Sequence, residues 1–124
     1  HGYSHLNGLK TPVRAYCADV LKGRDITCSN LFRPPYGTIR RRQYRILERS
    51  MQIVFWSVMP YDFDQSLTAD ESYAILMRRL KPGTVIVLHD KPSSTALQYL
   101  DRFLKNAMDD GWSFGLVDDS LTLT

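Results

Sequence analysis

The chain has 124 residues, of which 44% are hydrophobic and 23% are charged, a balance that is ordinary for one globular domain. None of its apolar runs approaches the roughly 20 residues that a helix needs to cross a bilayer. The formal net charge of +3 is mildly basic and gives only weak support to an anionic partner. Cys17 and Cys28 form no metal or redox motif, so we expect two buried or half-buried thiols.

The chain opens on a histidine pair and continues into a predicted helix. His1 and His5 lie four residues apart, a spacing at which two imidazoles on one helical turn or tight loop can share a cation. Thr11-Pro12 is typical of a helix start, with threonine as the N-cap and proline in the first helical position. Apolar residues at helical spacing then predict a helix that weakens from about Gly23: Val13, Tyr16, Cys17, Val20 and Leu21.

The middle of the chain predicts a strand, a helix and a second strand. Residues 31–33 form a short apolar run that Pro34-Pro35 stops, which indicates the end of a strand. Residues 38–51 are predicted to be a helix with arginines on its outer side. Its inner stripe is Tyr44, Leu47 and Met51, and its outer arginines are Arg41, Arg42, Arg45 and Arg49. Residues 53–58 are rich in β-branched and aromatic side chains and favour a strand.

The second half repeats this alternation. Thr68 and Glu71 form a capping box, so a helix is predicted from there to about Lys81-Pro82-Gly83, with Tyr73, Leu76, Met77 and Leu80 inward. Residues 84–88 are a continuous apolar run, typical of a strand buried on both faces of a parallel sheet. A last helix ends at Gly111, and residues 114–117 are a candidate final strand. The inward positions of that helix are predicted to be Leu97, Leu100, Leu104 and Met108.

This alternation predicts an α/β fold with a parallel sheet or barrel, in which chemistry collects where strands end. Arg33, the pair Asp62 and Asp64, and His89 all stand at the ends of predicted strands. Each has a purely structural alternative: a surface ion pair for Arg33, a turn for the aspartates, and a helix cap for His89-Asp90. Together with the histidine pair, the set favours a functional site.

Four motifs in chain order resemble the polysaccharide deacetylase family, which is the NodB-homology domain or carbohydrate esterase family 4. They are His1-Gly2-Tyr3-Ser4-His5, Phe32-Arg33-Pro34-Pro35-Tyr36-Gly37, Tyr61-Asp62-Phe63 and Val87-Leu88-His89-Asp90. The resemblance runs over nearly the whole chain. It implies a partial, distorted (β/α) barrel that lacks its first strands, and metal-dependent hydrolysis of N-acetyl groups on an amino-sugar polysaccharide.

The resemblance also implies roles for individual residues. His1 and His5 would be two ligands of a divalent metal, usually zinc, that polarises the acetyl carbonyl. Arg33 would orient the carboxylate that serves as catalytic base, and the backbone N–H of Tyr36 would help to stabilise the oxyanion. His89 would be the general acid that protonates the leaving amine.

The remaining implied residues surround this acid and the acetyl group. Asp62 would hold the tautomer of His89 and favour its imidazolium form. Val87 and Leu88 would line an apolar pocket for the acetyl methyl group, and Phe63 and Pro35 would contact the substrate.

The chain departs from the family pattern at several points. Gly2 stands where a serine or threonine is common, and Met59 and Phe63 stand where the fourth motif often has aspartate and tryptophan. The family's first motif supplies a third metal ligand and the base from a strand ending in Asp-Asp. Asp109-Asp110 and Asp118-Asp119 do not fit it, and we interpret them as a helix-end turn and a solvated tail. We therefore expect an Asp-Asp strand upstream of His1.

The leading hypothesis is the C-terminal portion, residues 1–124, of a glycan N-deacetylase domain. We expect this portion alone to be inactive, to bind metal weakly, and to cover an unpaired sheet edge by dimerising or swapping. The alternative is a non-catalytic glycan-binding or scaffold domain with the same fold. A nucleic-acid interface at Arg40-Arg41-Arg42 is disfavoured, because it has no interleaved aromatic residues. The family favours the cell envelope, but localisation stays open, as do the glycan and the metal.

Overall fold

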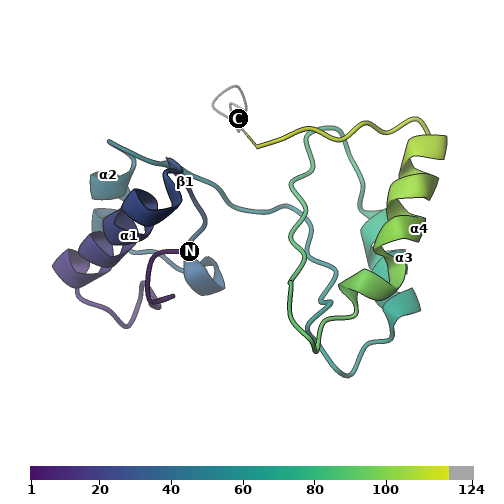
Figure 1. Ribbon diagram of the computed structural model, residues 1–124, viewed down its shortest axis with the longest axis horizontal. Coiled ribbons are helices and arrows are strands. Elements are labelled where there is room, and N and C mark those ends of the chain that lie inside the picture. Colours follow the sequence, from purple (N-terminus) through teal and green to yellow (C-terminus); the bar gives the residue numbers. More distant parts are fainter. Residues whose placement is uncertain (118–124) are drawn as a thin grey trace. The chain divides into compact units, whose positions relative to one another are not determined.

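The computed structural model describes residues 1–117, and these form two compact units, residues 1–55 and residues 56–117. The first unit contains α1 (Val13–Thr27), β1 (Leu31–Phe32), the 3-10 turn η1 (Pro35–Gly37), α2 (Arg41–Leu47) and β2 (Gln52–Ile53) (Figure 1). The second contains α3 (Ala69–Arg78) and α4 (Ala96–Asp109). Within residues 1–117, no helix combines the length and the apolar character that crossing a membrane requires.

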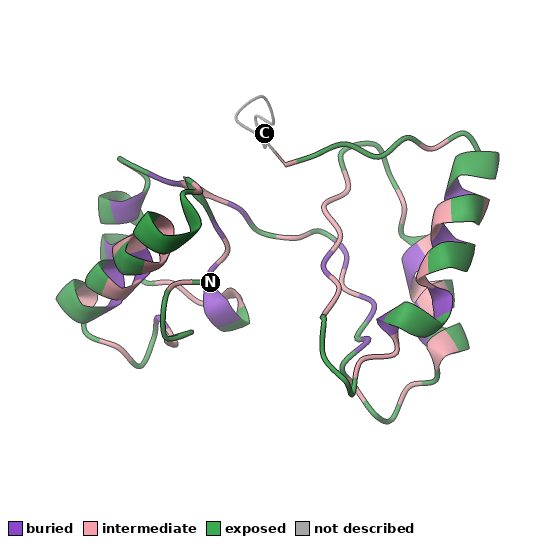
Figure 2. Cartoon of the chain, in the orientation of Figure 1, coloured by how far each residue is buried: buried purple, intermediate pink, exposed green. Residues whose placement is uncertain are grey.

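In the first unit, two helices pack beside a short parallel sheet. Strands β1 and β2 pair in parallel, with Leu31 opposite Gln52 and Phe32 opposite Ile53. The core of this unit is visible as the buried positions of Figure 2, and it consists of Tyr16, Cys17, Val20, Phe32, Leu47 and Met51. Parallel strands need a crossover connection, and α2 lies in the segment that joins them.

Helix α1 begins one residue later than predicted and ends later. Pro12 is its N-cap rather than its first helical residue. The helix continues through Gly23 to Thr27 and closes on Cys28 in the left-handed conformation (φ 52°). Gly23 therefore lies inside the helix, where its lack of a side chain leaves room for the N-terminal loop: a Cβ there would lie 2.8 Å from the carbonyl carbon of Gly2.

Helix α2 is shorter than the predicted range 38–51, and one of its buried positions differs from the prediction. Leu47 and Met51 are buried as predicted, whereas the inward prediction for Tyr44 is wrong, since its side chain is 38% exposed. Gln43 is buried instead. Its amide donates to the carbonyl oxygens of Gly8 (2.9 Å) and Thr11 (3.2 Å), and its oxygen accepts from the backbone N–H of Arg40 (2.8 Å).

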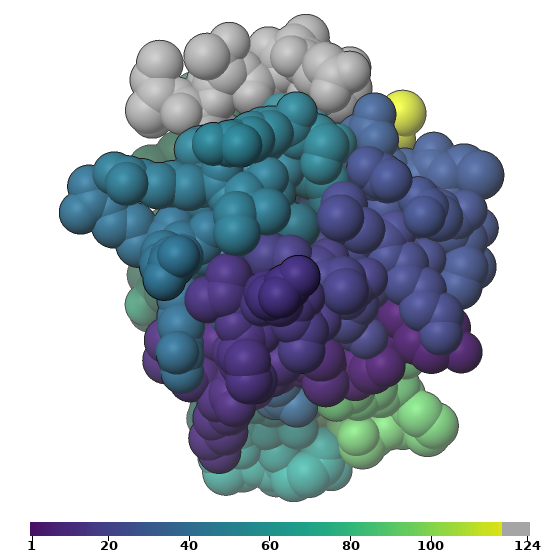
Figure 3. All heavy atoms as spheres, turned by 90° about the vertical axis from the view of Figure 1, so that its left-hand side faces the viewer, coloured from purple at the N-terminus to yellow at the C-terminus, as the bar shows by residue number. Residues whose placement is uncertain are grey.

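The predicted outer arginines of this segment are all exposed: Arg41, Arg42, Arg45 and Arg49. The prediction of a solvated arginine face is therefore confirmed. Figure 3 turns the first unit, coloured purple to teal-blue, toward the viewer.

In the second unit, α3 and α4 pack against each other and against a short parallel ladder. Residue Val58 bridges to Ile86 in parallel, and the N–H of Val87 donates to the carbonyl of Val58 (3.0 Å). The predicted capping box opens α3: the Glu71 N–H donates to Thr68 Oγ1 (3.2 Å) and the Thr68 N–H donates to Glu71 Oε2 (2.8 Å). Of the predicted strand at residues 84–88, the structure contains one β-bridge, the one between Ile86 and Val58.

Helix α4 ends at Asp109, two residues before Gly111, so Asp109-Asp110 is a helix-end turn as predicted. Its inward stripe differs from the predicted one and consists of Ala96, Tyr99, Phe103 and Ala107. Leu97 and Met108 were predicted inward and are 77% and 57% exposed. Residues 114–117 are irregular rather than a strand, and the Phe114 ring contacts Phe103 at 5.8 Å between centroids.

The two parallel pairings and the intervening helices confirm the mixed α/β class. The described sheet is open and has two strands, so the partial barrel stays a prediction. Asp118 and Asp119 lie outside the described residues.

Candidate active site

The histidine pair lies in an exposed loop that precedes α1. The rings of His1 and His5 have their centroids 4.9 Å apart with an interplanar angle of 55°. The His5 ring also makes an edge contact with Tyr36, at 5.1 Å between centroids. The first unit therefore brings together three of the predicted site residues, on a surface open to a ligand.

Asp19 of α1 fixes the backbone of this loop. The Ser4 N–H donates to both Asp19 carboxylate oxygens (3.1 Å each), and the Tyr3 N–H donates to the Asp19 carbonyl (3.2 Å). Gly2 adopts a left-handed φ of 73°, and a Cβ there would lie 2.8 Å from Asp19 Oδ2. Glycine in place of the expected serine or threonine therefore suits this loop, which Asp19 steadies instead.

Sequence reasoning missed Asp19 altogether. A carboxylate beside Val20 on a predicted helix carries no distinctive signal, because such residues are usually solvated. Only the approach of the loop to the helix, made possible by Gly2 and Gly23, gives Asp19 its partners.

Arg33 directly follows β1, as predicted, and is half-buried. Burial lowers the pKa of its guanidinium. Pro34 and Pro35 are buried beyond it; Pro34 precedes the tight turn η1 and Pro35 is its first residue. Within that turn Tyr36 adopts a left-handed φ of 59°, and its side chain is 67% exposed beside His5.

The donor set of this loop fits part of a zinc site. Imidazole nitrogens are preferred zinc ligands, and a catalytic zinc has three protein ligands with one open position. The neighbouring imidazoles of His1 and His5 suit two of those positions. Across residues 1–117, no three histidine, cysteine, aspartate or glutamate side chains stand close enough to hold an ion together.

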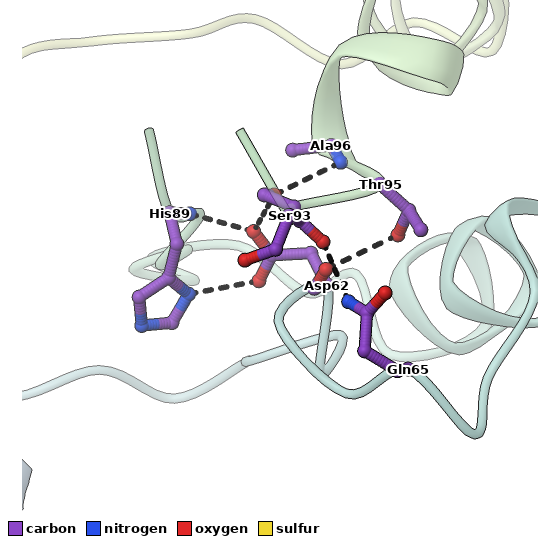
Figure 4. Close-up of polar contacts among 7 residues, drawn as sticks. Asp62, Gln65, His89, Ser93, Thr95 and Ala96 are labelled. Atoms are coloured by element: carbon purple, nitrogen blue, oxygen red, sulfur yellow. Dashed lines mark hydrogen bonds and ion pairs between the residues drawn. The ribbon is translucent and has the colours of Figure 1, made fainter. Parts of the chain in front are cut away.

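The second unit contains a buried aspartate paired with a histidine (Figure 4). Asp62 is 0% exposed, and its Oδ1 lies 2.9 Å from Nδ1 of His89. Its Oδ2 accepts from the His89 backbone N–H (2.7 Å) and from Ser94 Oγ (2.6 Å). The side chain of His89 remains 23% exposed. The predicted Asp62–His89 contact is therefore present in the structure.

These contacts set the charge of the carboxylate. Burial alone would raise the pKa of Asp62, but the hydrogen bonds from Ser94 and His89 outweigh it, and the pKa is lowered. Because an ionised carboxylate only accepts hydrogen bonds, Nδ1 of His89 must carry the proton. Burial and the charge of Asp62 also raise the pKa of the neighbouring Tyr99 to about 12.

Aromatic rings border His89. The Phe63 ring meets it at 4.9 Å between centroids and 75°, and Phe63 is 42% exposed. Tyr61 lies 6.2 Å from Phe63 and adopts a left-handed φ of 57°. Val87 is buried and Leu88 is half-buried against the core of this unit.

Sequence reasoning also missed the residues that anchor Asp62 from the start of α4. Ser94 bonds the carboxylate, and the Thr95 N–H donates to the Asp62 carbonyl (2.8 Å). Nearby, Gln65 Nε2 donates to the Ser93 carbonyl (2.7 Å). A serine and threonine before an apolar helical run are a recognisable helix-start signal, but nothing in the sequence links them to Asp62.

Compared by sequence, the chain matches no family model and none of the curated proteins. Solved structures do resemble it. A peptidoglycan N-acetylglucosamine deacetylase shares 27% identity at a TM-score of 0.86, covering 94% of this chain and 59% of that protein. A family 4 carbohydrate esterase from Streptomyces lividans shares 22% identity at a TM-score of 0.84, covering 95% and 64%.

A third similar structure is a family 4 pseudoenzyme from Bacillus anthracis, with 22% identity, a TM-score of 0.82, and 94% and 43% of the two chains covered. The chain therefore spans less than two thirds of each of these proteins. These likenesses confirm the resemblance to the polysaccharide deacetylase family.

Proposed function

We propose that this chain, which has the fold of the family 4 polysaccharide deacetylases, is part of an enzyme that hydrolyses N-acetyl groups on an amino-sugar polysaccharide. The observation that carries the proposal is the buried, ionised Asp62 paired with the partly exposed imidazole of His89. Burying a charge costs free energy unless the charge is paired or hydrogen-bonded. Here the buried carboxylate is hydrogen-bonded to an imidazole, a side chain suited to acid–base chemistry.

The first part of the proposed site is a metal centre. His1 and His5 would hold a divalent cation, for which we propose zinc, through the two imidazoles that the loop places side by side. Such an ion polarises a carbonyl group and lowers the pKa of water. The Asp19 carboxylate and the close packing at Gly2 and Gly23 hold the backbone of the loop that carries the two imidazoles.

Arg33 and Tyr36 would complete the electrostatics of the first unit. The half-buried guanidinium of Arg33 would orient the carboxylate that acts as base. The backbone N–H of Tyr36, in the tight turn beside His5, would donate to the oxyanion of the tetrahedral intermediate. Preorganised donors of this kind act on charge that develops only in the transition state.

His89 would be the general acid. Asp62 fixes Nδ1–H, so the second ring nitrogen, Nε2, is the one that delivers a proton to the departing amine. The lowered pKa of Asp62 keeps its carboxylate charged near neutral pH, so it can accept the Nδ1 proton of His89 throughout the reaction.

The substrate would be an acetylated amino-sugar polymer. Phe63 would bind a sugar face beside His89, and Pro35 would contact the polymer near the metal loop. Val87 and Leu88 would border the acetyl methyl group with apolar surface. The structural neighbour that acts on peptidoglycan N-acetylglucosamine supports this class of substrate.

An assay of acetate release tests this function. The full protein that carries this chain, loaded with zinc, should release acetate from acetylated chitin oligomers or from peptidoglycan, and a chelator should stop the release. Acetate release that is unaffected by complete metal removal would contradict the metal-centre part of the proposal.

A second candidate is a non-catalytic glycan-binding domain, since the fold also occurs in a pseudoenzyme and the pair Tyr61 and Phe63 is exposed. Exposed aromatic faces can bind sugar rings without any reaction. Saturable glycan binding in a zinc-loaded protein that releases no acetate would favour this candidate over the enzyme.

A further inference from the structure

We propose that Ser94 is a positioning residue for His89: its hydroxyl holds the Asp62 carboxylate in the orientation that fixes the His89 tautomer. The importance of Ser94 for turnover rests on the proposed function of His89 as acid. The effect of Ser94 on the His89 tautomer is independent of that function, because this effect follows from the hydrogen bonds alone.

The hydrogen bonds of the Asp62 carboxylate come from two places. Oδ1 bonds the ring of His89 and Oδ2 bonds the backbone N–H of the same residue. If these were the whole set, Asp62 and His89 could turn together without any change in their own contacts. The bond from Ser94 Oγ (2.6 Å) ties the carboxylate to a different segment of the chain.

Ser94 is itself fixed at the start of α4. Its oxygen accepts from the Ala96 N–H (3.1 Å) while its hydroxyl proton is donated to Asp62. Thr95 ties the backbone of Asp62 to the same place, through its N–H (2.8 Å) and its Oγ1 (3.3 Å). The backbone and the side chain of Asp62 are therefore both anchored by hydrogen bonds to the start of α4.

The two roles of this hydroxyl restrict which side chains can replace serine. Threonine can donate to Asp62 and accept from Ala96 in the same way, whereas alanine can do neither and cysteine is a weak donor. Ser93, the preceding residue, offers a matched control: it is exposed, and its backbone carbonyl rather than its hydroxyl accepts the hydrogen bond from Gln65 Nε2.

The tautomer of the neutral His89 ring reports directly on this arrangement. In water the neutral imidazole of histidine prefers to carry its proton on Nε2, and the Asp62 carboxylate reverses this preference by accepting from Nδ1. Nitrogen-15 NMR of the side chain, at a pH where the ring is neutral, measures the two tautomers in the whole chain.

Wild type and Ser94→Thr should show His89 mainly as the Nδ1–H tautomer, and Ser93→Ala should match them. Ser94→Ala should shift the tautomer ratio about tenfold toward Nε2–H, because a carboxylate that Ser94 no longer holds can turn away from Nδ1 and weaken the charge-assisted hydrogen bond that favours Nδ1–H. Ser94→Cys should shift it in the same direction while filling the same space, which covers the case in which the alanine variant does not fold.

A wild-type tautomer ratio in Ser94→Ala or in folded Ser94→Cys would overturn the proposal, as would an equal shift in Ser93→Ala. The proposed function can fail separately. A protein that releases no acetate but shows the expected tautomer shifts would keep Ser94 as a positioning residue and remove the catalytic role of His89.

Discussion

Asp62 is fully buried, yet its carboxylate accepts three hydrogen bonds, two from His89 and one from Ser94. The sequence allowed the prediction that Asp62 lies behind His89, because the family resemblance pairs their motifs. It could not predict Ser94, whose position depends on how α4 begins. The hydrogen-bond partners of a single polar residue depend on which segments fold against it, and Asp19, whose carboxylate accepts from the Ser4 N–H, is a second example.

The lowered pKa of Asp62 predicts an acid-dependent stability. A carboxyl whose pKa is lowered by folding stabilises the folded state above its unfolded pKa of about 4, and this contribution is lost as the pH falls through the folded pKa. Asp62→Asn should therefore be less stable than wild type at neutral pH, with a gap that narrows below about pH 4. Urea unfolding across this pH range measures the gap. A gap that stays constant down to pH 2 would contradict the assignment.

The close packing at Gly23 predicts that replacing it by alanine lowers stability, although alanine has the higher helix propensity. Alanine in a helix interior normally stabilises by about 1 kcal/mol relative to glycine. Here a Cβ would lie 2.8 Å from the Gly2 carbonyl carbon, so Gly23→Ala should destabilise the chain and displace the histidine loop. Thermal unfolding checks this, with Arg14→Ala at an exposed position of α1 as the control. A rise in melting temperature for Gly23→Ala would refute the close packing.

At the scale of elements, the sequence predicted the positions of the helices better than their buried faces. Both α2 and α4 lie where periodicity placed them, but the buried stripe of α4 is shifted by one position and α2 buries Gln43 in place of Tyr44. Apolar patterning ignores a glutamine, and the amide partners of Gln43 belong to the loop at Gly8 and Thr11. In α4 two alanines, Ala96 and Ala107, are buried together with Tyr99 and Phe103 while Leu97 is exposed, so the packing of the unit and not side-chain hydrophobicity alone decides which face turns inward.

The capping box of α3 is a local feature, and the sequence sufficed to predict it. Thr68→Ala should destabilise the second unit by about 1 kcal/mol, because it leaves the Glu71 N–H without its cap. Thr68→Ser, which keeps the hydroxyl, should be near wild type. Denaturant unfolding of both variants makes the comparison, and equal losses in the two would show that the hydroxyl is not what matters.

At the scale of the molecule, the two units have separate cores, centred on residues such as Leu47 in one and Leu76 in the other. The order of motifs predicted the resemblance to the deacetylase structures, because that signal is spread along the whole chain. Strand pairing could not be predicted in the same way, since the sequence of an apolar run such as residues 84–88 does not specify which other strand it pairs with. The structure pairs that run with Val58 through a single bridge.

Because the two cores are separate, shortening a core side chain in one unit should destabilise mainly that unit. Leu76 is 0% exposed, so Leu76→Ala should cost about 2–5 kcal/mol through lost burial and the cavity left behind. Hydrogen exchange should then accelerate in α3 and α4 more than in α1 and α2. Equal acceleration in all four helices would show instead that the units unfold as one.

The most direct test of the central claim is the turnover of His89→Ala in the full protein that carries this chain, loaded with zinc and supplied with an acetylated glycan. Loss of a general acid should lower turnover by about 10²–10⁴-fold while the protein stays folded. Asp90→Ala, at the exposed neighbouring position, serves as the matched control and should retain activity. Wild-type turnover in a folded His89→Ala protein would contradict the account.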